Sequence, residues 1–481
     1  MPEIGTRQIR HSSGMNAIEL GRALMEASPG SNAFRHYARS LASLAFSANR
    51  AVATEASRVV LSKVVQPLAD RFCQDACDCL AVFMAEAVHA PRSPIASAIA
   101  KLGYPTPQHL IERYGMLDCG ALEKHVDPDD VEKAVVISRA DLKADIAVTS
   151  PILSCAMRAF YDAEIEIVGP RTNCLLIGPS YRLERNVVSY SHDSTLGNQL
   201  KAWTRLRAKV ASAIQGFDAG RWLVVDPDSW MTQFGLLPLA DDRYCRFFDS
   251  RSYAEQSTAT IAELANEWAN QWFFWGGVEA LPYVVLGYGP ENGSLCLARE
   301  SRGKLAGVSF SVDGRKQVRL GADFEDRLME LLRRRGYQTV VDCGREAVDR
   351  TNAMERIRAF GGSKSHLRVT SDAPNNRAQL LMCGATIPNF SGWVRWASVY
   401  IGYDSAISHA VGSVGVPSVH LSVGAPNSTY RARWTPTSDG EIVTIPADDP
   451  TNGPAILDRI GTELNRIEKD SPWAGLDDDR E

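Results

Sequence analysis

Apolar residues recur at helical spacing through the first 125 residues of the chain. MNAIELGRALMEA, at 15–27, and a longer stretch at 48–90 both place apolar side chains along one helix face. Pro67 is expected to end or kink the longer stretch, because proline has no N–H for the helix ladder. Thr106 and Pro107 predict the start of another helix, which we expect to close at Gly115. The pattern therefore predicts an all-α region.

The pattern changes near residue 132, where short runs rich in β-branched residues begin to alternate with amphipathic helices. Such alternation predicts mostly parallel sheets covered by helices. A Gly- and Pro-rich interval at 286–294 separates two series of these runs. In chain order, the runs expected to form strands are EKAVVIS, AEIEIVGP, NCLLIGP, WLVVDPD and YCRFFD, then LAGVSFSV, QTVVDC, HLRVTS, SVYIGYDS, SVHLSV and EIVTIP.

The expected fold class is α/β, with two Rossmann-like domains behind a helical extension. Ligands of open α/β sheets bind beyond the carboxyl ends of the strands, so two facing domains are expected to form a ligand-binding cleft. The predicted boundaries are 1–125 for the extension, 130–290 and 300–450 for the two domains, and 451–481 for a C-terminal helix and tail.

Composition narrows the class of protein. The 481 residues are 45% hydrophobic, enough for several domain cores, and the formal net charge of −5 gives no general attraction to nucleic acid. Ten cysteines without paired spacing, and no apolar leader in the first thirty residues, predict a cytoplasmic protein. No run reaches the roughly 18 apolar residues of a transmembrane helix. Peripheral membrane contact and homo-oligomerisation stay open.

The clearest candidate for chemistry is YIGYDSAISHAVGSVGVPSVHL, at 400–421. If SVYIGY is a strand and the helix begins near Ser405, the free amides of Ser405 and Ala406 would face a phosphate. His409 lies one turn further along and can donate to the same ligand. The plainer interpretation is that Asp404 or Ser405 caps the helix, and this stretch alone does not decide between them.

Two further segments follow strands of the second series. In SFSVDGRKQVR, the hydroxyls of Ser309 and Ser311 and the cations Arg315 and Lys316 suit a diphosphate, although a solvated basic loop explains them equally well. In VVDCGREAVD, Glu346 follows a strand and is placed to accept hydrogen bonds from a ribose diol. Taken alone, this glutamate is more typical of a surface position.

In the first series, Asp145 ends the loop of VVISRADLKADIAVTSP, just before the next helix. It could act as a general base on an acceptor hydroxyl or simply cap that helix. Cys73, Cys77 and Cys79 form the one cysteine cluster, but their spacing matches no zinc or iron–sulfur pattern. We expect these cysteines to pack in a core and expect no bound metal.

Taken in chain order, these segments resemble glycosyltransferase family 9, the ADP-heptose:lipopolysaccharide heptosyltransferases. DSAISHAVGSVGVPSVHL is similar to that family's Asp-Ser/Thr-Gly-x-x-His helix and following Gly-x-Pro. KADIAVTSP resembles its Gly-Asp loop, VVDPDSWMTQFGLLPL its fourth strand and helix, GRK its phosphate lysine, and CGREA its Gly-x-Glu. The match covers about residues 130–450, with Ala144 and Ala406 where the family usually has glycine.

The resemblance implies a GT-B fold and inverting transfer of a sugar from a nucleotide-diphosphate donor, with neither metal nor further cofactor. It implies that Asp145 is the general base and that Glu346 binds the ribose. Asp404 would orient the donor, and the diphosphate would be held by Ser311, Lys316, Ser405, Ala406 and His409. The acceptor, whether glycan, protein or small molecule, stays open.

Two rival functions remain. One is transfer of a different sugar to a protein or natural-product acceptor. The other is a non-catalytic binding or scaffold protein that uses its helical extension as the working surface.

Overall fold

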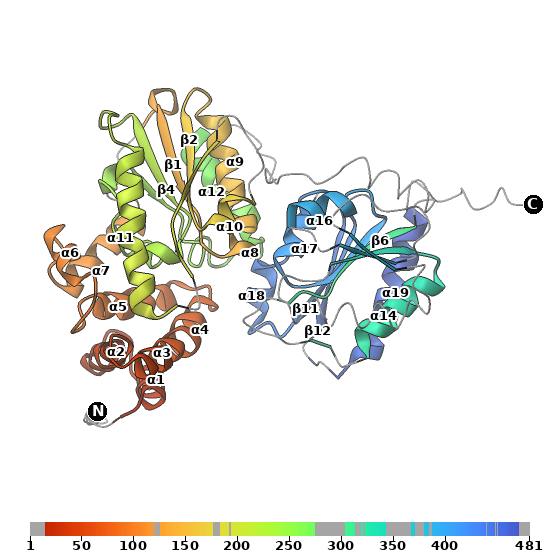
Figure 1. Ribbon diagram of the computed structural model, residues 1–481, viewed down its shortest axis with the longest axis horizontal. Helices are drawn as coiled ribbons and strands as arrows, with labels where there is room; N and C mark the ends of the chain where they lie inside the picture. Colours follow the sequence, from red (N-terminus) through yellow and green to blue (C-terminus); the bar gives the residue numbers. More distant parts are fainter. Residues whose placement is uncertain are drawn as a thin grey trace, which may run out of the picture.

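The computed structural model places two lobes side by side, with the N-terminal helices against the first lobe (Figure 1). The structure describes residues 15–118, 120, 126–176, 183–191, 194–274, 304–312, 319–320, 323–342, 367–370, 380–383, 387–438, 440–447, 449 and 451–470. The expected α/β fold class, two Rossmann-like parallel-sheet domains behind a helical region, is confirmed.

The N-terminal region is helical, as predicted, but two of its boundaries differ from expectation. Helical backbone continues through Pro67, because a π-helical turn precedes it and changes the hydrogen-bond register. Gly115 lies inside a helix whose buried side chains on either side outweigh glycine's poor propensity. The elements are α1 (Ala17–Glu26), α2 (Asn32–Ala45), α3 (Arg50–Val59), η1 (Val60–Val65), α4 (Gln66–Ala69), α5 (Gln74–Val88), α6 (Ala96–Lys101) and α7 (Pro107–Asp118).

The first domain has a parallel five-stranded sheet in the order β3-β2-β1-β4-β5. Its strands are β1 (Lys133–Ile137), β2 (Glu164–Gly169), β3 (Leu183–Val187), β4 (Trp222–Asp226) and β5 (Cys245–Phe247). The other elements are η2 (Pro128–Asp130), α8 (Leu142–Ala144), η3 (Asp145–Thr149), α9 (Ser150–Ala159), α10 (Arg171–Cys174), α11 (Leu196–Ala213), η4 (Trp230–Thr232), η5 (Asp242–Tyr244) and α12 (Ile261–Phe274).

One expected strand in this domain is wrong. The described start of NCLLIGP is the end of α10 and a turn, and Asn173 there donates to the Asp145 carboxylate. The strand that pairs with β2 is β3, whose sequence LERNV is polar and partly exposed. An edge strand of that kind lacks the continuous apolar run that identifies buried strands.

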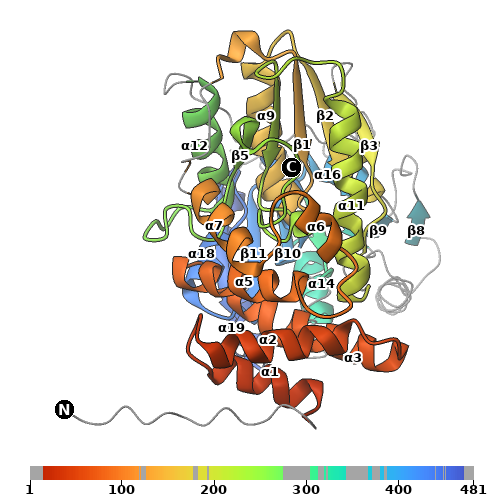
Figure 2. The same cartoon turned by 90° about the vertical axis from the view of Figure 1, so that its left-hand side faces the viewer.

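Alternate residues of the first sheet pack against different helices. Val135 and Val224 point into a core with α11 and the N-terminal helices, whereas Ala134 and Val136 point into a core with α9 and α12. Leu41 of α2 and Trp203 of α11 belong to the same apolar cluster. The N-terminal helices therefore share one core with the first domain, and Figure 2 shows α2 and α5 beneath it.

The second domain has a parallel seven-stranded sheet in the order β12-β11-β10-β6-β7-β9-β8. Its strands are β6 (Leu305–Ser309), β7 (Gln338–Asp342), β8 (Leu367–Thr370), β9 (Leu380–Cys383), β10 (Val399–Tyr403), β11 (Ser418–Val423) and β12 (Ile442–Ala447). One face packs against α14 (Phe324–Arg334) and α19 (Gly453–Asp470), and the other against α16 (Ile387–Val394) and α17 (Ala406–Gly412). Sequence analysis did not anticipate β9.

The connection between β11 and β12 leaves the second domain and docks on the first. It contains α18 (Ser428–Arg433), whose Tyr430 is buried in the apolar cluster of α9 and α12. Arg433 Nη2 donates to the Ala254 carbonyl at 2.7 Å, and Thr260 and Thr437 share a hydrogen bond of 2.8 Å. The two domains thus contact each other through a segment that lies between two adjacent strands of the second sheet.

Candidate functional site at the domain contact

The two segments that carried the strongest sequence signals lie against each other in the structure. The turn formed by α8 and η3 follows β1, and α17 follows β10. Ile146 of η3 belongs to the same apolar cluster as Ile407 and Ala410 of α17. The carboxyl ends of β1 and β10 therefore meet at the domain contact, where α8 and α18 are seen in Figure 1. At this point the contact is packed, with Ala406 against the same cluster.

A buried ion pair joins the two domains here. Lys143 Nζ lies 2.5 Å from Asp404 Oδ1, and the lysine side chain is only 5% exposed. The ammonium also lies over the ring of Trp434, 4.6 Å from its centroid, and 5.6 Å from that of Tyr430. Cation–π contact of this kind compensates in part for the loss of water around a buried ammonium. Sequence analysis did not identify Lys143, although it lies two residues before Asp145.

Two histidines surround the same carboxylate. His420 Nε2 lies 3.5 Å from Asp404 Oδ1, and the His409 ring packs edge-on against Trp434 with centroids 6.1 Å apart. Both histidines are buried. His409 Nε2 and His420 Nδ1 have no hydrogen-bond partner among the described residues. Buried polar atoms without a partner are costly, so a ligand that supplies partners would bind favourably.

At the start of α17, where free amide groups were expected, one amide is already bonded within the first turn of the helix. The Ser405 N–H donates to Ser408 Oγ at 3.2 Å, and that hydroxyl donates to the Ser405 carbonyl at 2.7 Å. Ser405 occupies the N-cap position of α17. The predicted roles of Ser405, Ala406 and His409 in binding a donor stay predictions.

Burial and charge fix the protonation of this cluster. Burial alone would raise the pKa of Asp404, but the Lys143 ammonium and His420 hold that pKa well below its usual range. Burial and the nearby Lys143 ammonium lower the pKa of His409 from 6.5 to about 3. At neutral pH Asp404 is therefore a carboxylate and His409 is neutral.

The depressed pKa of His409 predicts a loss of stability in mild acid. Between pH 6.5 and about 3, His409 is protonated in the unfolded chain and neutral in the folded chain. The free energy of unfolding therefore falls as the pH falls through this range. Lowering the pH from 7.5 to 5.0 should cost about 2 kcal/mol from this residue. Urea unfolding at a series of pH values measures the slope.

A matched variant isolates the contribution of His409. His409→Gln keeps a polar side chain that does not titrate, and should flatten the slope between pH 7.5 and 5.0. His36→Gln, on α2 and far from the cluster, should leave the slope as in the wild type. An unchanged slope in His409→Gln would show that other groups cause the acid sensitivity.

Asp145 is buried and its carboxylate is surrounded by donors. Oδ1 accepts from the Arg139 N–H at 2.7 Å and from Thr149 Oγ1 at 2.5 Å. Oδ2 accepts from Ser138 Oγ at 2.6 Å and from Asn173 Nδ2. Burial raises the pKa of Asp145, against these four hydrogen bonds, which favour the ionised form. A carboxylate has about four acceptor positions, so all of them are filled here.

The serine pair of the second domain lies at the carboxyl ends of β6 and β7. Ser309 Oγ donates to Asp342 Oδ2 at 3.0 Å, and Ser311 Oγ donates to the same oxygen at 2.7 Å. Asp342 was missed as a site residue, although its position at the end of a predicted strand was a usable signal. The predicted donor-binding residues Arg315, Lys316 and Glu346 lie outside the described residues.

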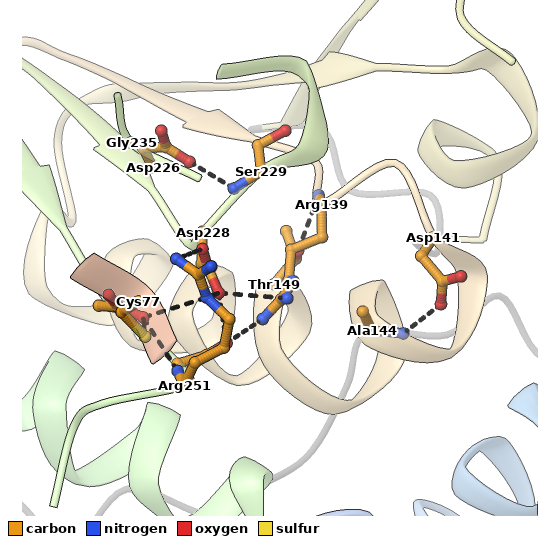
Figure 3. A network of polar contacts seen from close by, with 12 residues as sticks. Cys77, Arg139, Asp141, Ala144, Thr149, Asp226, Asp228, Ser229, Gly235 and Arg251 are labelled. Carbon is orange, nitrogen blue, oxygen red and sulfur yellow. Dashed lines mark hydrogen bonds and ion pairs between the residues drawn. The ribbon is translucent and has the colours of Figure 1, made fainter. Parts of the chain in front are cut away.

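A second polar network lies at the carboxyl ends of β1, β4 and β5, with no solvent exposure at its centre (Figure 3). Asp228 Oδ1 lies 3.0 Å from Arg251, and Asp228 Oδ2 lies 3.3 Å from Arg139. Burial raises the pKa of Asp228 to about 7, against these two guanidinium groups. Cys77 of α5 lies 3.9 Å from Asp249, and Tyr114 of α7 donates to Asp249 at 2.6 Å.

This network bears on where a ligand of the first domain can bind. The edge formed by the carboxyl ends of the strands is the usual ligand side of an open α/β sheet. At β4 and β5 this edge is covered by Cys77 and Tyr114 of the N-terminal helices. Burial strongly raises the pKa of the Cys77 thiol, so this cysteine is held as an unreactive thiol.

No protein-family model and no curated protein sequence matches the chain. The chain is similar to solved glycosyltransferases. One is a glycosyltransferase family 9 protein from Veillonella parvula, with 14% identity, a TM-score of 0.46, and coverage of 72% of this chain and 92% of that one.

Two Escherichia coli structures show a similar degree of likeness. ADP-heptose lipopolysaccharide heptosyltransferase II has 16% identity and a TM-score of 0.46, over 70% of this chain and 99% of that one. A heptosyltransferase solved with ADP has 12% identity and a TM-score of 0.48 over the same shares. These values describe likeness of fold and assign no residue of this chain a role.

No group of three or more His, Cys, Asp or Glu in the described part of the chain is arranged to hold a metal ion. Cys73 and Cys79 pack with the N-terminal apolar cluster, as expected. Within the ranges described, no helix combines the length and apolarity needed to cross a bilayer.

Proposed function

We propose that this chain is a glycosyltransferase that moves a sugar, a heptose by resemblance, from a nucleotide-diphosphate donor to an acceptor hydroxyl. The observation that carries the proposal is the polar cluster where the carboxyl ends of β1 and β10 meet, in which the buried Lys143, His409 and His420 surround the partly exposed Asp404. Buried polar atoms without hydrogen-bond partners at that point suit a polar ligand, and the Lys143 ammonium suits an anionic one. The order of the motifs along the chain also supports the proposed transferase function.

In the proposed reaction the acceptor oxygen attacks the anomeric carbon as the bond from that carbon to the diphosphate breaks. The bonding electrons leave with the diphosphate, and direct displacement inverts the anomeric centre. Asp404 orients the donor, while Ser311, Lys316 and His409 stabilise the developing negative charge, so neither metal nor further cofactor is needed. The remaining donor contacts are proposed for Ser309, Arg315, Glu346, Ser405 and Ala406.

Asp145 is the proposed general base, and its surroundings set a condition on that role. It can take the acceptor proton only after one of its four donors gives up its position. Ser138 and Thr149 donate through hydroxyl groups that can rotate, so they are the groups able to yield. The backbone N–H of Arg139 is fixed.

A panel of nucleotide sugars tests the proposal. ADP-, GDP-, UDP- and CDP-sugars are added to the full chain, and the shift in thermal midpoint is measured, because a ligand that binds the folded state raises it. We expect one base to give a clear, saturable shift, followed by slow release of the nucleoside diphosphate with water or an added acceptor. A panel without any shift, together with no diphosphate release, would contradict the proposal.

A non-catalytic binding protein is the second candidate, and the filled carboxylate of Asp145 favours it. Such a protein would bind one nucleotide sugar in the same panel but release no diphosphate under any acceptor. Transfer of another sugar to a protein or natural product remains within the first proposal, since the panel identifies the base and the sugar together.

A further inference from the structure

Lys143 is the charged group that the first domain places beside Asp404 at the domain contact. Its side chain is 5% exposed, and its ion pair with Asp404 is 2.5 Å long. Lysine ammonium groups carry three N–H donors, and a single carboxylate oxygen does not use them all. The two neighbouring indole and phenol rings offer faces rather than acceptors.

Buried ring nitrogens without hydrogen-bond partners among the described residues lie around this ammonium. His409 and His420 are 4% and 2% exposed, and each has a ring nitrogen without a hydrogen-bond partner among the described residues. Asp404 is the acidic group paired with the ammonium, and its Oδ1 also lies 3.5 Å from His420. The carboxylate therefore occupies the position that an oxygen of an anionic ligand would take.

We propose that Lys143 binds a phosphate-bearing ligand. In the protein without ligand, Asp404 Oδ1 occupies the position beside the ammonium that an oxygen of the ligand would take. When the ligand binds, an anionic oxygen replaces Asp404 at the ammonium, and Asp404 stays paired with His420. The proposal rests on the proposed function for its ligand class, and it adds a cation from the first domain to a site otherwise built from the second. Lys143 of the first domain would then contact a donor that is otherwise held by the second domain.

The test measures the affinity of the full chain for pyrophosphate by calorimetry, with adenosine as an uncharged probe. Lys143→Met should weaken pyrophosphate binding about tenfold or more, because a charge-assisted hydrogen bond is lost. Asp404→Asn should tighten it, because the competing carboxylate is gone. Lys209→Met, an exposed lysine on α11, is the matched control and should bind like the wild type.

The expected changes in pyrophosphate affinity have opposite signs in Lys143→Met and Asp404→Asn, and this distinguishes ligand binding from a purely structural ion pair. If Lys143 only neutralises Asp404, the two single variants would change pyrophosphate affinity alike. The double variant Lys143→Met/Asp404→Asn removes both charges and covers the case in which Lys143→Met does not fold. Weak pyrophosphate binding in the folded double variant supports the proposal, and wild-type affinity there overturns it.

The same experiments separate this inference from the proposed function. Inorganic phosphate and pyrophosphate probe the anion site alone, whereas ADP and the nucleotide sugars add the nucleoside. Lys143-dependent pyrophosphate binding without any nucleotide-sugar binding would keep the anion site and reject the transferase. Nucleotide-sugar transfer that is unaffected in Lys143→Met would keep the transferase and reject the role of Lys143.

Discussion

Replacing Asp145 with asparagine is expected to lower the free energy of unfolding by about 3 kcal/mol. The Arg139 N–H and the Asn173 amide both donate to this carboxylate, and an asparagine amide can satisfy only one of its two sides with an acceptor oxygen. A buried donor left without a partner carries the full cost of losing water. Urea unfolding of the purified variant measures the change.

Asp141→Asn is the matched control for this substitution. Asp141 lies on the same loop and caps α8 by accepting from the Ala144 N–H at 3.0 Å, as Figure 3 shows, and asparagine caps a helix equally well. This variant should keep wild-type stability. If Asp145→Asn proved as stable as Asp141→Asn, the four-donor arrangement would not be what holds the loop after β1.

The structural role of Asp145 also changes how its catalytic role should be tested. Loss of turnover in Asp145→Asn would follow from either role, so it does not identify the base. Thr149→Val instead keeps the carboxylate and removes one of its donors, which raises the pKa of Asp145. If Asp145 is the base, the acid limb of the pH–rate profile should move to higher pH in Thr149→Val.

Replacing Arg113 with methionine is expected to lower the free energy of unfolding by about 4 kcal/mol. Arg113 is buried on α7, and its guanidinium forms a two-pronged ion pair with Asp242 at 2.8 and 2.5 Å. Its third nitrogen donates to the carbonyls of Gly235 and Leu236 at 2.8 and 3.1 Å. Methionine fills much of the volume but leaves a carboxylate and two carbonyls without their partner.

The same variant tests whether the N-terminal helices are an integral part of the first domain. Because they share its core, we expect wild type and Arg113→Met each to unfold in one transition that includes the first domain. Arg58→Met removes an exposed pair with Glu55 on α3 and should leave the denaturant midpoint unchanged. Independent unfolding of the helical region at lower denaturant would contradict a shared core.

Sequence reasoning identified the strands that form continuous apolar runs, such as WLVVD and VYIGY, because both faces of those strands are buried. It missed a strand that is recognisable only by its pairing in the sheet, and it predicted a strand where the apolar segment begins as a helical turn. LERNV pairs at an edge, and the apolar residues after Asn173 follow a helical turn that brings Asn173 to Asp145. Neither the pairing of LERNV at the sheet edge nor the contact between Asn173 and Asp145 can be inferred from the local sequence.

The candidate site was predicted in outline and missed in its chemistry. From sequence alone, Asp404 was placed at a strand end and Asp145 at the end of the loop that follows a strand. The donors that fill Asp145 come from β1, η3 and α10, and the partner of Asp404 comes from the other domain. Such partners depend on how separate segments pack, so spacing along the chain could not reveal that Lys143 pairs with Asp404.

The docked connection between β11 and β12 has a consequence for how the halves can move. Both flanking strands belong to the second sheet, yet Tyr430 between them is held in the core of the first domain. Withdrawing that ring into water would cost about 2 kcal/mol. A separation of the two domains that keeps Tyr430 in place would therefore have to bend the chain where this segment leaves β11 after Val423 and where it rejoins β12 at Ile442.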